Sequence, residues 1–146
     1  FSVKSDKKNF LTKLSLTDFS QDKATVICYG GLTELVVDYV FNYYLETEIP
    51  LRVVVLAKLN PLNYKIIKEN IFDTENVFIV EESDGKYGLS SEIISNLSED
   101  IDCKNKKFKR ITSKTGAIPA SIELENKFLI NKEKFFDIVN NHLKDA

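Results

Sequence analysis

Histidine, cysteine and methionine are scarce or absent in this chain. His142 is the only histidine among the 146 residues, which excludes a histidine-based triad or a multi-histidine metal site within the chain. Cys28 lies in an apolar run and Cys103 in a polar stretch, and they form neither a CxxC motif nor a disulfide framework. A reducing cytoplasm is therefore expected. Methionine is missing even at position 1, which suggests that the chain is a piece of a longer polypeptide.

Long apolar runs and strong net charge are also missing. No run approaches the ~20 apolar residues that span a bilayer, and residues 1–10 lack the basic-then-apolar pattern of a signal peptide. The net charge of −2 predicts no strong attraction to nucleic acid or to an anionic membrane. Neither a GxGxxG motif nor a P-loop is present, so no nucleotide-binding fingerprint supports a ligand.

Strand-like and helix-like patterns alternate along the chain. Short apolar runs predict strands at residues 24–29, 51–56, 77–81 and 108–112. Helical spacing of apolar residues predicts helices at residues 33–46, 62–71, 89–98 and 132–144. Thr33 is expected to cap the first helix and Pro61 to begin the second. This order predicts a largely parallel sheet with helices on both faces. Residues 9–14 are a candidate edge strand, and residues 1–8 are expected to be a loose lead.

Two short motifs follow predicted strands. Gly30-Gly31 could offer backbone N–H groups to an anion, although a plain strand-to-helix turn is favoured. Glu81-Glu82 ends a strand where α/β sheets hold their ligands, so the pair could bind a divalent cation or act in acid–base chemistry. The favoured interpretation is structural, because neighbouring strand residues point to opposite faces. One carboxylate would then meet a backbone amide or a lysine, and the other would face water.

Other polar features are assigned to the surface. The basic run at residues 104–110 is expected to form a solvated loop and edge strand, with a docking patch as the alternative. His142 is expected to face solvent in the last helical turn, and Cys28 to be buried as a small hydrophobe. The residues alone thus predict an α/β domain without an evident catalytic set.

Four segments, taken in order, resemble one family. These are ATVICYGGLT (24–33), LRVVVLAKLNPLN (51–63), NVFIVEESDGKYGLSSEI (76–93) and TGAIPASIELENKFLINKEKFFDIVNNHL (115–143). Together, over about residues 10–144, they resemble the C-terminal domain of transketolase-type enzymes. The fourth segment is similar to the tail of the beta subunits of pyruvate and branched-chain 2-oxoacid dehydrogenases.

The resemblance implies a three-layer α/β/α fold with a five-stranded, mostly parallel sheet and one antiparallel edge strand, here residues 9–14. It implies a parent enzyme that holds thiamine diphosphate and a divalent cation such as Mg²⁺ between two other domains. The GDG…N signature of that cofactor site is not found in this chain. No catalytic, cofactor-binding or metal-binding residue is therefore expected here. The implied partners are the remaining domains of the parent, in a homodimer or an alpha/beta heterotetramer, and an acyltransferase core.

Some positions match the family and others depart from it. The family's second strand usually continues with an acid and an arginine, and here Val55 and Ala57 stand at those places; the aspartate of the following turn is Asn63. This loss removes charges that a dimer interface or substrate channel could use. The matched positions nearest a neighbouring domain are predicted to be interface or channel residues rather than catalysts: Gly30, Glu81, Glu82, Tyr87, Gly88 and Glu92.

The predicted function is a non-catalytic C-terminal domain of a thiamine-diphosphate enzyme, serving dimer assembly and partner docking. The parent could be a 2-oxoacid dehydrogenase, a transketolase or a deoxyxylulose-phosphate synthase, and the PASIELE tail at residues 119–125 favours the first. This hypothesis predicts exposed apolar surface on the domain, because its neighbours are missing. The alternative is a free-standing, flavodoxin-like ligand-binding or interaction module, which predicts a pocket at the carboxyl ends of the strands.

Overall fold

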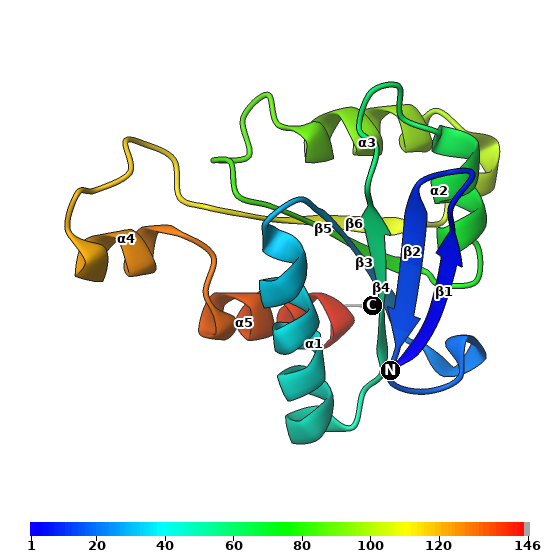
Figure 1. The fold of residues 1–146 in the computed structure, drawn as a ribbon, viewed down its shortest axis with the longest axis horizontal. Helices are drawn as coiled ribbons and strands as arrows, with labels where there is room; N and C mark the ends of the chain where they lie inside the picture. Colours follow the sequence, from blue (N-terminus) through cyan, green and yellow to red (C-terminus); the bar gives the residue numbers. More distant parts are fainter. Residues whose placement is uncertain (145–146) are drawn as a thin grey trace.

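A six-stranded sheet forms the centre of the protein in the computed structural model, which describes residues 1–144 (Figure 1). The strand order is β1-β2-β4-β3-β5-β6, and only β2 runs against the others. The strands are β1 (Ser2–Asp6), β2 (Leu11–Ser15), β3 (Ala24–Tyr29), β4 (Leu51–Leu56), β5 (Asn76–Glu81) and β6 (Lys107–Thr112). The predicted mixed α/β fold with a mostly parallel sheet is confirmed.

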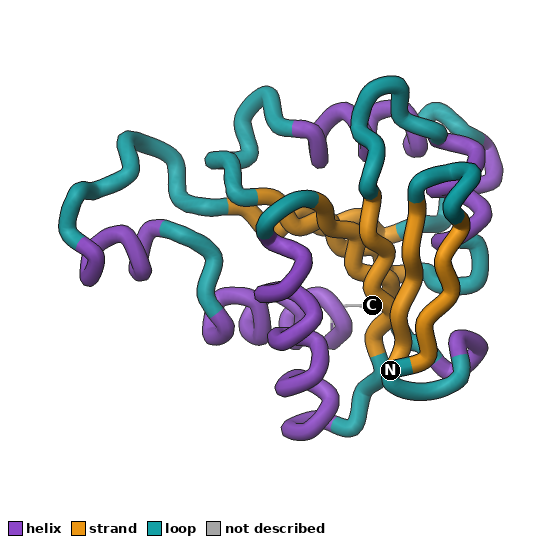
Figure 2. The backbone as a smooth tube through the Cα atoms, viewed as in Figure 1, coloured by secondary structure: helices purple, strands orange, loops and turns teal. Residues whose placement is uncertain are grey.

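Helices cover both faces of the sheet (Figure 2). They are α1 (Leu32–Thr47), α2 (Tyr64–Ile71), α3 (Leu89–Ser98), α4 (Ile122–Phe128) and α5 (Lys132–Lys144), with short 3-10 turns η1 (Phe19–Gln21) and η2 (Ile101–Cys103). Helices α1 and α5 bury Val36, Val40, Phe135 and Val139 against one face. Helices α2 and α3 bury a second apolar cluster against the other face. Because both faces are covered, strands β3, β4 and β5 are buried and mostly apolar on both faces rather than alternating.

The amino-terminal strands correct the sequence prediction. The sheet has six strands instead of five, because residues 1–8 contain strand β1 instead of a loose lead. Strand β2 is therefore not at the edge: it lies between β1 and β4. The polar sequence of β1 gave no signal, since its pairing with β2 depends on backbone hydrogen bonds and its side chains are mostly exposed. The turn that joins the two strands is closed by Asp6, which accepts hydrogen bonds from Asn9.

Three local predictions were wrong. Thr33 does not cap α1, whose N-cap is Gly31 without a side-chain hydrogen bond. Pro61 lies in the preceding loop, and α2 begins at Tyr64, where Asn63 caps the backbone N–H of Ile66. His142 is half-buried instead of facing solvent. Its ring packs edge-on against Phe78 with centroids 5.2 Å apart, because the last turn of α5 lies on the sheet.

The amino ends of the parallel strands hold a buried ion cluster. Arg52 is 1% exposed, and its Nε lies 3.1 Å from Oδ2 of the buried Asp22. Its two terminal nitrogens donate to both carboxylate oxygens of Asp73. Carbonyl oxygens of Phe19 and Asn70 accept further hydrogen bonds from the same guanidinium. The charge of Arg52 is thus fully paired, as a buried charge must be.

Candidate functional site

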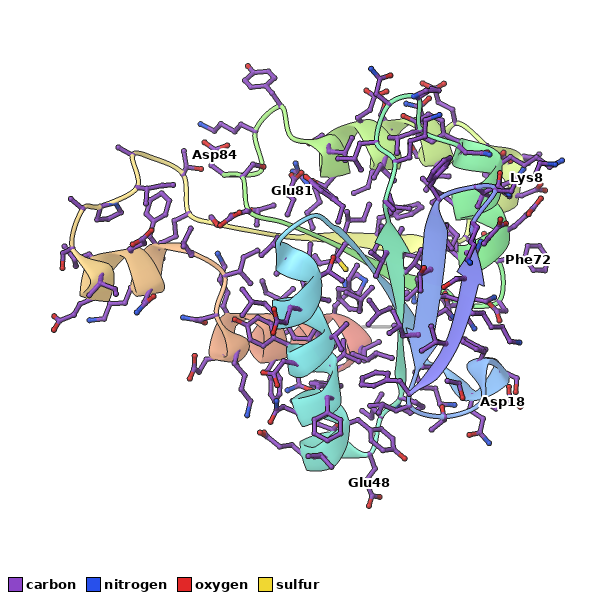
Figure 3. All side chains as sticks on the ribbon, viewed as in Figure 1. Lys8, Asp18, Glu48, Phe72, Glu81 and Asp84 are labelled. Carbon is purple, nitrogen blue, oxygen red and sulfur yellow. The ribbon has the colours of Figure 1, made fainter. Side chains whose placement is uncertain are left out.

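Glu81 is the centre of a polar network at the carboxyl ends of the strands (Figure 3). It is the last residue of β5 and is fully buried. Its carboxylate accepts hydrogen bonds from the Ser90 backbone N–H at 3.0 Å, from the Ser90 hydroxyl, and from the Tyr29 hydroxyl at 3.2 Å. Among residues 1–144, no cation pairs with it. Neutral donors and the amino end of α3 therefore hold this negative charge.

Glu82 follows the prediction for alternating strand residues. Glu81 points inward to a backbone amide, whereas Glu82 is exposed. The two carboxylates therefore do not act as a pair, and the interpretation of this motif as a two-carboxylate catalytic or cation site has no geometric support. The alternation that fixes this outcome was readable from the sequence, because adjacent strand residues face opposite sides.

The Glu81 network fixes the loop that follows β5. A Cβ on Gly88 would overlap the Glu81 carboxylate and crowd the Ser83 hydroxyl, so any larger residue there must displace these side chains. Gly85 has φ +76 and lies against Thr112, a position that requires glycine. Between these two glycines, Tyr87 has φ 56 and a fully exposed side chain. The loop thus presents an aromatic side chain outward from a rigid base.

The other predicted site residues lie at different distances from this network. Gly30 has φ +61 at the carboxyl end of β3, directly after Tyr29, and open space lies where its Cβ would be. Glu92 is exposed on α3, where its Oε1 accepts hydrogen bonds from Tyr64 and Asn96. Gly30 and Gly88 therefore adjoin the Glu81 network, whereas Glu92 joins α3 to α2 on the surface.

Two members of the network were missed from the sequence. Tyr29 ends a strand and Ser90 stands two residues after Gly88, and neither belongs to a recognisable motif. Burial, followed by the charge and the hydrogen bond of Glu81, raises the pKa of the Tyr29 hydroxyl to about 12. The phenol therefore stays protonated at neutral pH and donates to the carboxylate. The available signal was positional: both residues flank predicted strand and helix ends at the edge where α/β sheets hold ligands.

The nucleophile and metal chemistry of the chain is limited. Burial raises the pKa of the Cys28 thiol to about 12, which makes it a poor nucleophile. Both Cys28 and Cys103 are buried free thiols, as predicted for Cys28. Over residues 1–144, no three His, Cys, Asp or Glu side chains gather in a way that could hold a metal. No helix in the same range has the length and apolarity needed to cross a membrane.

Comparison with known proteins decides the family. The sequence model described as "Transketolase, C-terminal domain" matches residues 16–135, which is most of the chain. This chain belongs to the transketolase C-terminal domain family.

Two relatives extend this family assignment. The chain is 29% identical over 126 residues to the pyruvate dehydrogenase E1 component subunit beta of Cyanidium caldarium, covering 86% of this chain and 38% of that protein. A solved structure, a split gene transketolase described as an inactive beta4 tetramer, superposes with a TM-score of 0.70 at 22% identity, covering 85% of this chain and 40% of the other. At 22% identity, the similarity to the split gene transketolase shows only that the two proteins share a fold. The transketolase C-terminal domain seen here thus spans about two fifths of either relative.

Proposed function

We propose that this chain is the non-catalytic C-terminal domain of a thiamine-diphosphate-dependent enzyme, where it serves assembly and partner docking. The family match over residues 16–135 carries this proposal. The relatives it resembles are much longer proteins, and this chain corresponds to 38% of one and 40% of the other. The remaining domains of such a parent, in a homodimer or an alpha/beta heterotetramer, are the proposed partners.

The chemistry of the Glu81 network favours a non-catalytic role for this domain. Glu81 is fully buried and accepts three hydrogen bonds from Tyr29 and Ser90, so its carboxylate is not open to a substrate. His142 packs against Phe78 and its Nε2 lies 3.3 Å from the carbonyl oxygen of Lys107, the first residue of β6, so it is remote from the carboxyl ends of the strands. The residues present do not fit the diphosphate and Mg²⁺ of the cofactor, since within residues 1–144 no group of three His, Cys, Asp or Glu side chains gathers at the Gly30-Gly31 turn or elsewhere. We therefore assign the cofactor site to other domains of the parent.

Exposed apolar side chains support docking. On α1, Leu35 is 47% exposed, Phe41 41% and Leu45 63%, although the opposite face of the helix is fully buried. The ring of Phe1 lies 6.4 Å from that of Phe41, so the amino terminus adds to this surface. Large apolar side chains exposed in groups mark surfaces that bind other proteins.

The parent is proposed to be of the 2-oxoacid dehydrogenase beta-subunit type, with transketolase as the nearest alternative. The identity to a pyruvate dehydrogenase E1 beta subunit over 126 residues favours the first. By this proposal an acyltransferase core is a further partner. A cytoplasmic location belongs to the same proposal, because the two cysteines are free thiols.

Thiamine diphosphate content tests this proposal. The natural polypeptide that contains residues 1–146 would be purified with its companions, and bound cofactor measured as thiochrome fluorescence after oxidation. A complex that retains thiamine diphosphate, and whose 2-oxoacid-dependent reduction of ferricyanide requires it, is expected. A natural polypeptide that has neither bound cofactor nor a cofactor-binding companion would show that the chain serves another purpose, and titration with nucleotides would then test the ligand-binding alternative.

A further inference from the structure

The segment between β6 and α5 leaves the body of the domain as an arm, defined here as residues 115–127. The Lys114 N–H donates to the Phe128 carbonyl at 3.0 Å and closes its base. Figure 1 shows the arm, with α4, projecting past the end of the sheet. Helix α4 has no buried residue, and Ile118, Ile122 and Leu124 are 58%, 71% and 54% exposed. An apolar arm without a covering surface is a candidate interface.

The arm also carries unpaired negative charge. Glu123 and Glu125 occupy the first turn of α4. Among residues 1–144, neither carboxylate takes part in an ion pair. Lys127 in the last turn of α4 brings the net charge of the arm to −1, and the first turn presents apolar and acidic side chains together. That first turn favours a receptor surface that combines cations with apolar walls.

A surface of that kind lies on the same domain, next to the base of the arm. A cavity of about 440 Å³ is lined by Lys86, Lys109 and Arg110 around the apolar side chains of Ile94 and Phe108. The guanidinium of Arg110 is held in place by hydrogen bonds to the carbonyl of Gly85 and the hydroxyl of Ser91. Lys86 and Lys109 have no ion-pair partner among the described residues. One carboxylate, that of Asp84, also lines the cavity and leaves its charge net positive.

No residue of the arm lines this cavity in its own copy. Strand β6 supplies Thr112 to the cavity wall and continues through Ser113 into the arm, so both surfaces lie at the same corner of the domain. A two-fold axis at that corner would bring the arm of each copy to the cavity of the other. Such a contact is isologous: it forms twice and closes without leaving a free end.

We propose that two copies of this chain exchange arms, with Glu123 and Leu124 of each copy docking in the Lys109–Arg110 cavity of the other. This inference gives the assembly role a defined interface and rests on the proposed function. The apolar side chains supply burial, and the opposite charges set the register of the arm and exclude the reverse orientation. Occupation of the cavity by another domain of the parent is the competing outcome.

Cysteine cross-linking in the natural polypeptide tests the exchange directly, whatever other contacts hold the assembly together. The pair L124C/K109C is expected to give a disulfide-linked dimer on a non-reducing gel after mild oxidation. The matched pair L124C/K23C should give none, because Lys23 is exposed at the opposite end of the sheet. The native thiols are both buried and should not contribute. Equal cross-linking of both pairs, or of neither, overturns the proposal.

Charge reversal provides an independent readout by sedimentation equilibrium. E123K and K109E are each expected to weaken self-association about tenfold, and the double variant E123K/K109E to restore it. Failure of the double variant to recover any association lost in the single variants contradicts a direct contact. Thiamine diphosphate would be measured in the same samples. A cofactor-loaded complex that gives no cross-linked dimer would contradict only the exchange of arms. A complex without thiamine diphosphate would contradict the proposed function and, with it, the exchange of arms.

Discussion

The two ends of the sheet bury charge in opposite ways. At the amino ends, Arg52 is surrounded by the carboxylates of Asp22 and Asp73, and charge meets opposite charge. At the carboxyl ends, Glu81 is just as buried but is held by hydroxyl and amide donors from Tyr29 and Ser90. Figure 3 shows the two ends on opposite sides of the molecule, with Asp18 and Glu48 near the first and Glu81 and Asp84 near the second.

This difference indicates that the amino ends of the strands serve the stability of the domain, whereas the carboxyl ends position a loop for contact with a partner. Arg52 ties β4 to η1 and to the loop after α2, and its charge is satisfied within the domain. Glu81 instead uses its hydrogen bonds to shape a loop that carries the exposed Tyr87. Removing a partner at either end should therefore have different consequences, and the following variants rank those consequences from the largest to the smallest.

Replacing Arg52 should cause the largest loss of stability. R52M leaves the buried carboxylate of Asp22 without its cation, which costs about 3–5 kcal/mol of unfolding free energy. Arg110, the other arginine, is exposed, so R110M should change stability by about 0.5 kcal/mol or less. Urea unfolding followed by circular dichroism measures both. Similar midpoints for the two variants would mean that the Arg52 cluster does not hold the amino end together.

A methyl group at Gly88 should be the most damaging small change at the carboxyl end. G88A drives a Cβ into the Glu81 carboxylate and the Ser83 hydroxyl, and overpacking of this kind costs about 1–3 kcal/mol. G31A is the matched control, because Gly31 has φ −64 and open space where the Cβ would be. It should be neutral or stabilising by up to about 1 kcal/mol. Thermal melts measure both variants, and equal melting temperatures for G88A and G31A would contradict a close approach of Gly88 to Glu81.

Neutralising Glu81 should have a moderate effect on stability. E81Q keeps the shape but turns an acceptor into an amide donor facing Ser90, so a loss of about 1–2 kcal/mol is expected. E82Q changes an exposed side chain and should be within about 0.5 kcal/mol of the wild type. Limited proteolysis should also become faster at residues 84–88 in E81Q alone. Equal behaviour of the two variants would remove Glu81 from its proposed positioning role.

The smallest effect should appear at high pH. The pKa of Tyr29 is raised from 10.0 to about 12 by burial first and by Glu81 second. A group whose pKa is raised in the folded state contributes its full stabilisation at pH values below its pKa in the unfolded chain. That contribution is lost as the pH rises through its pKa in the folded protein. The wild type should therefore lose stability between pH 10 and 12 more steeply than Y29F. Parallel urea midpoints for the two proteins across that range would contradict the raised pKa of Tyr29.

The central fold was predictable because its signals are local. Strands β3, β4 and β5 are apolar runs, and α1, α2, α3 and α5 repeat apolar residues at helical spacing. Strand β1 was missed because its stability comes from pairing with β2, which leaves no mark on its polar side chains. Helix α4 was missed for a related reason: none of its residues is buried, so no apolar face marks it.

The site was only partly predictable. Alternation along β5 predicted one buried and one exposed carboxylate at Glu81-Glu82 without saying which, and in the structure Glu81 is the buried one. The partners of Glu81 could not be found, because Tyr29 and Ser90 come from elements that meet only in the folded sheet. Arg52 offered a signal that was overlooked. An arginine inside the run LRVVVL must find buried counter-charges, although the sequence could not show that they are Asp22 and Asp73.

Hydrogen–deuterium exchange can test most directly whether the carboxyl end is the one that meets the rest of the enzyme. Amide exchange would be compared between this chain expressed alone and the same residues within the natural, cofactor-bound complex. We expect slower exchange in the complex for residues 35–45, 82–92 and 115–127, and unchanged exchange around Phe19 and Asp73. Protection confined to the amino end, with the Tyr87 loop and the arm unaffected, would reverse the roles assigned to the two ends of the sheet.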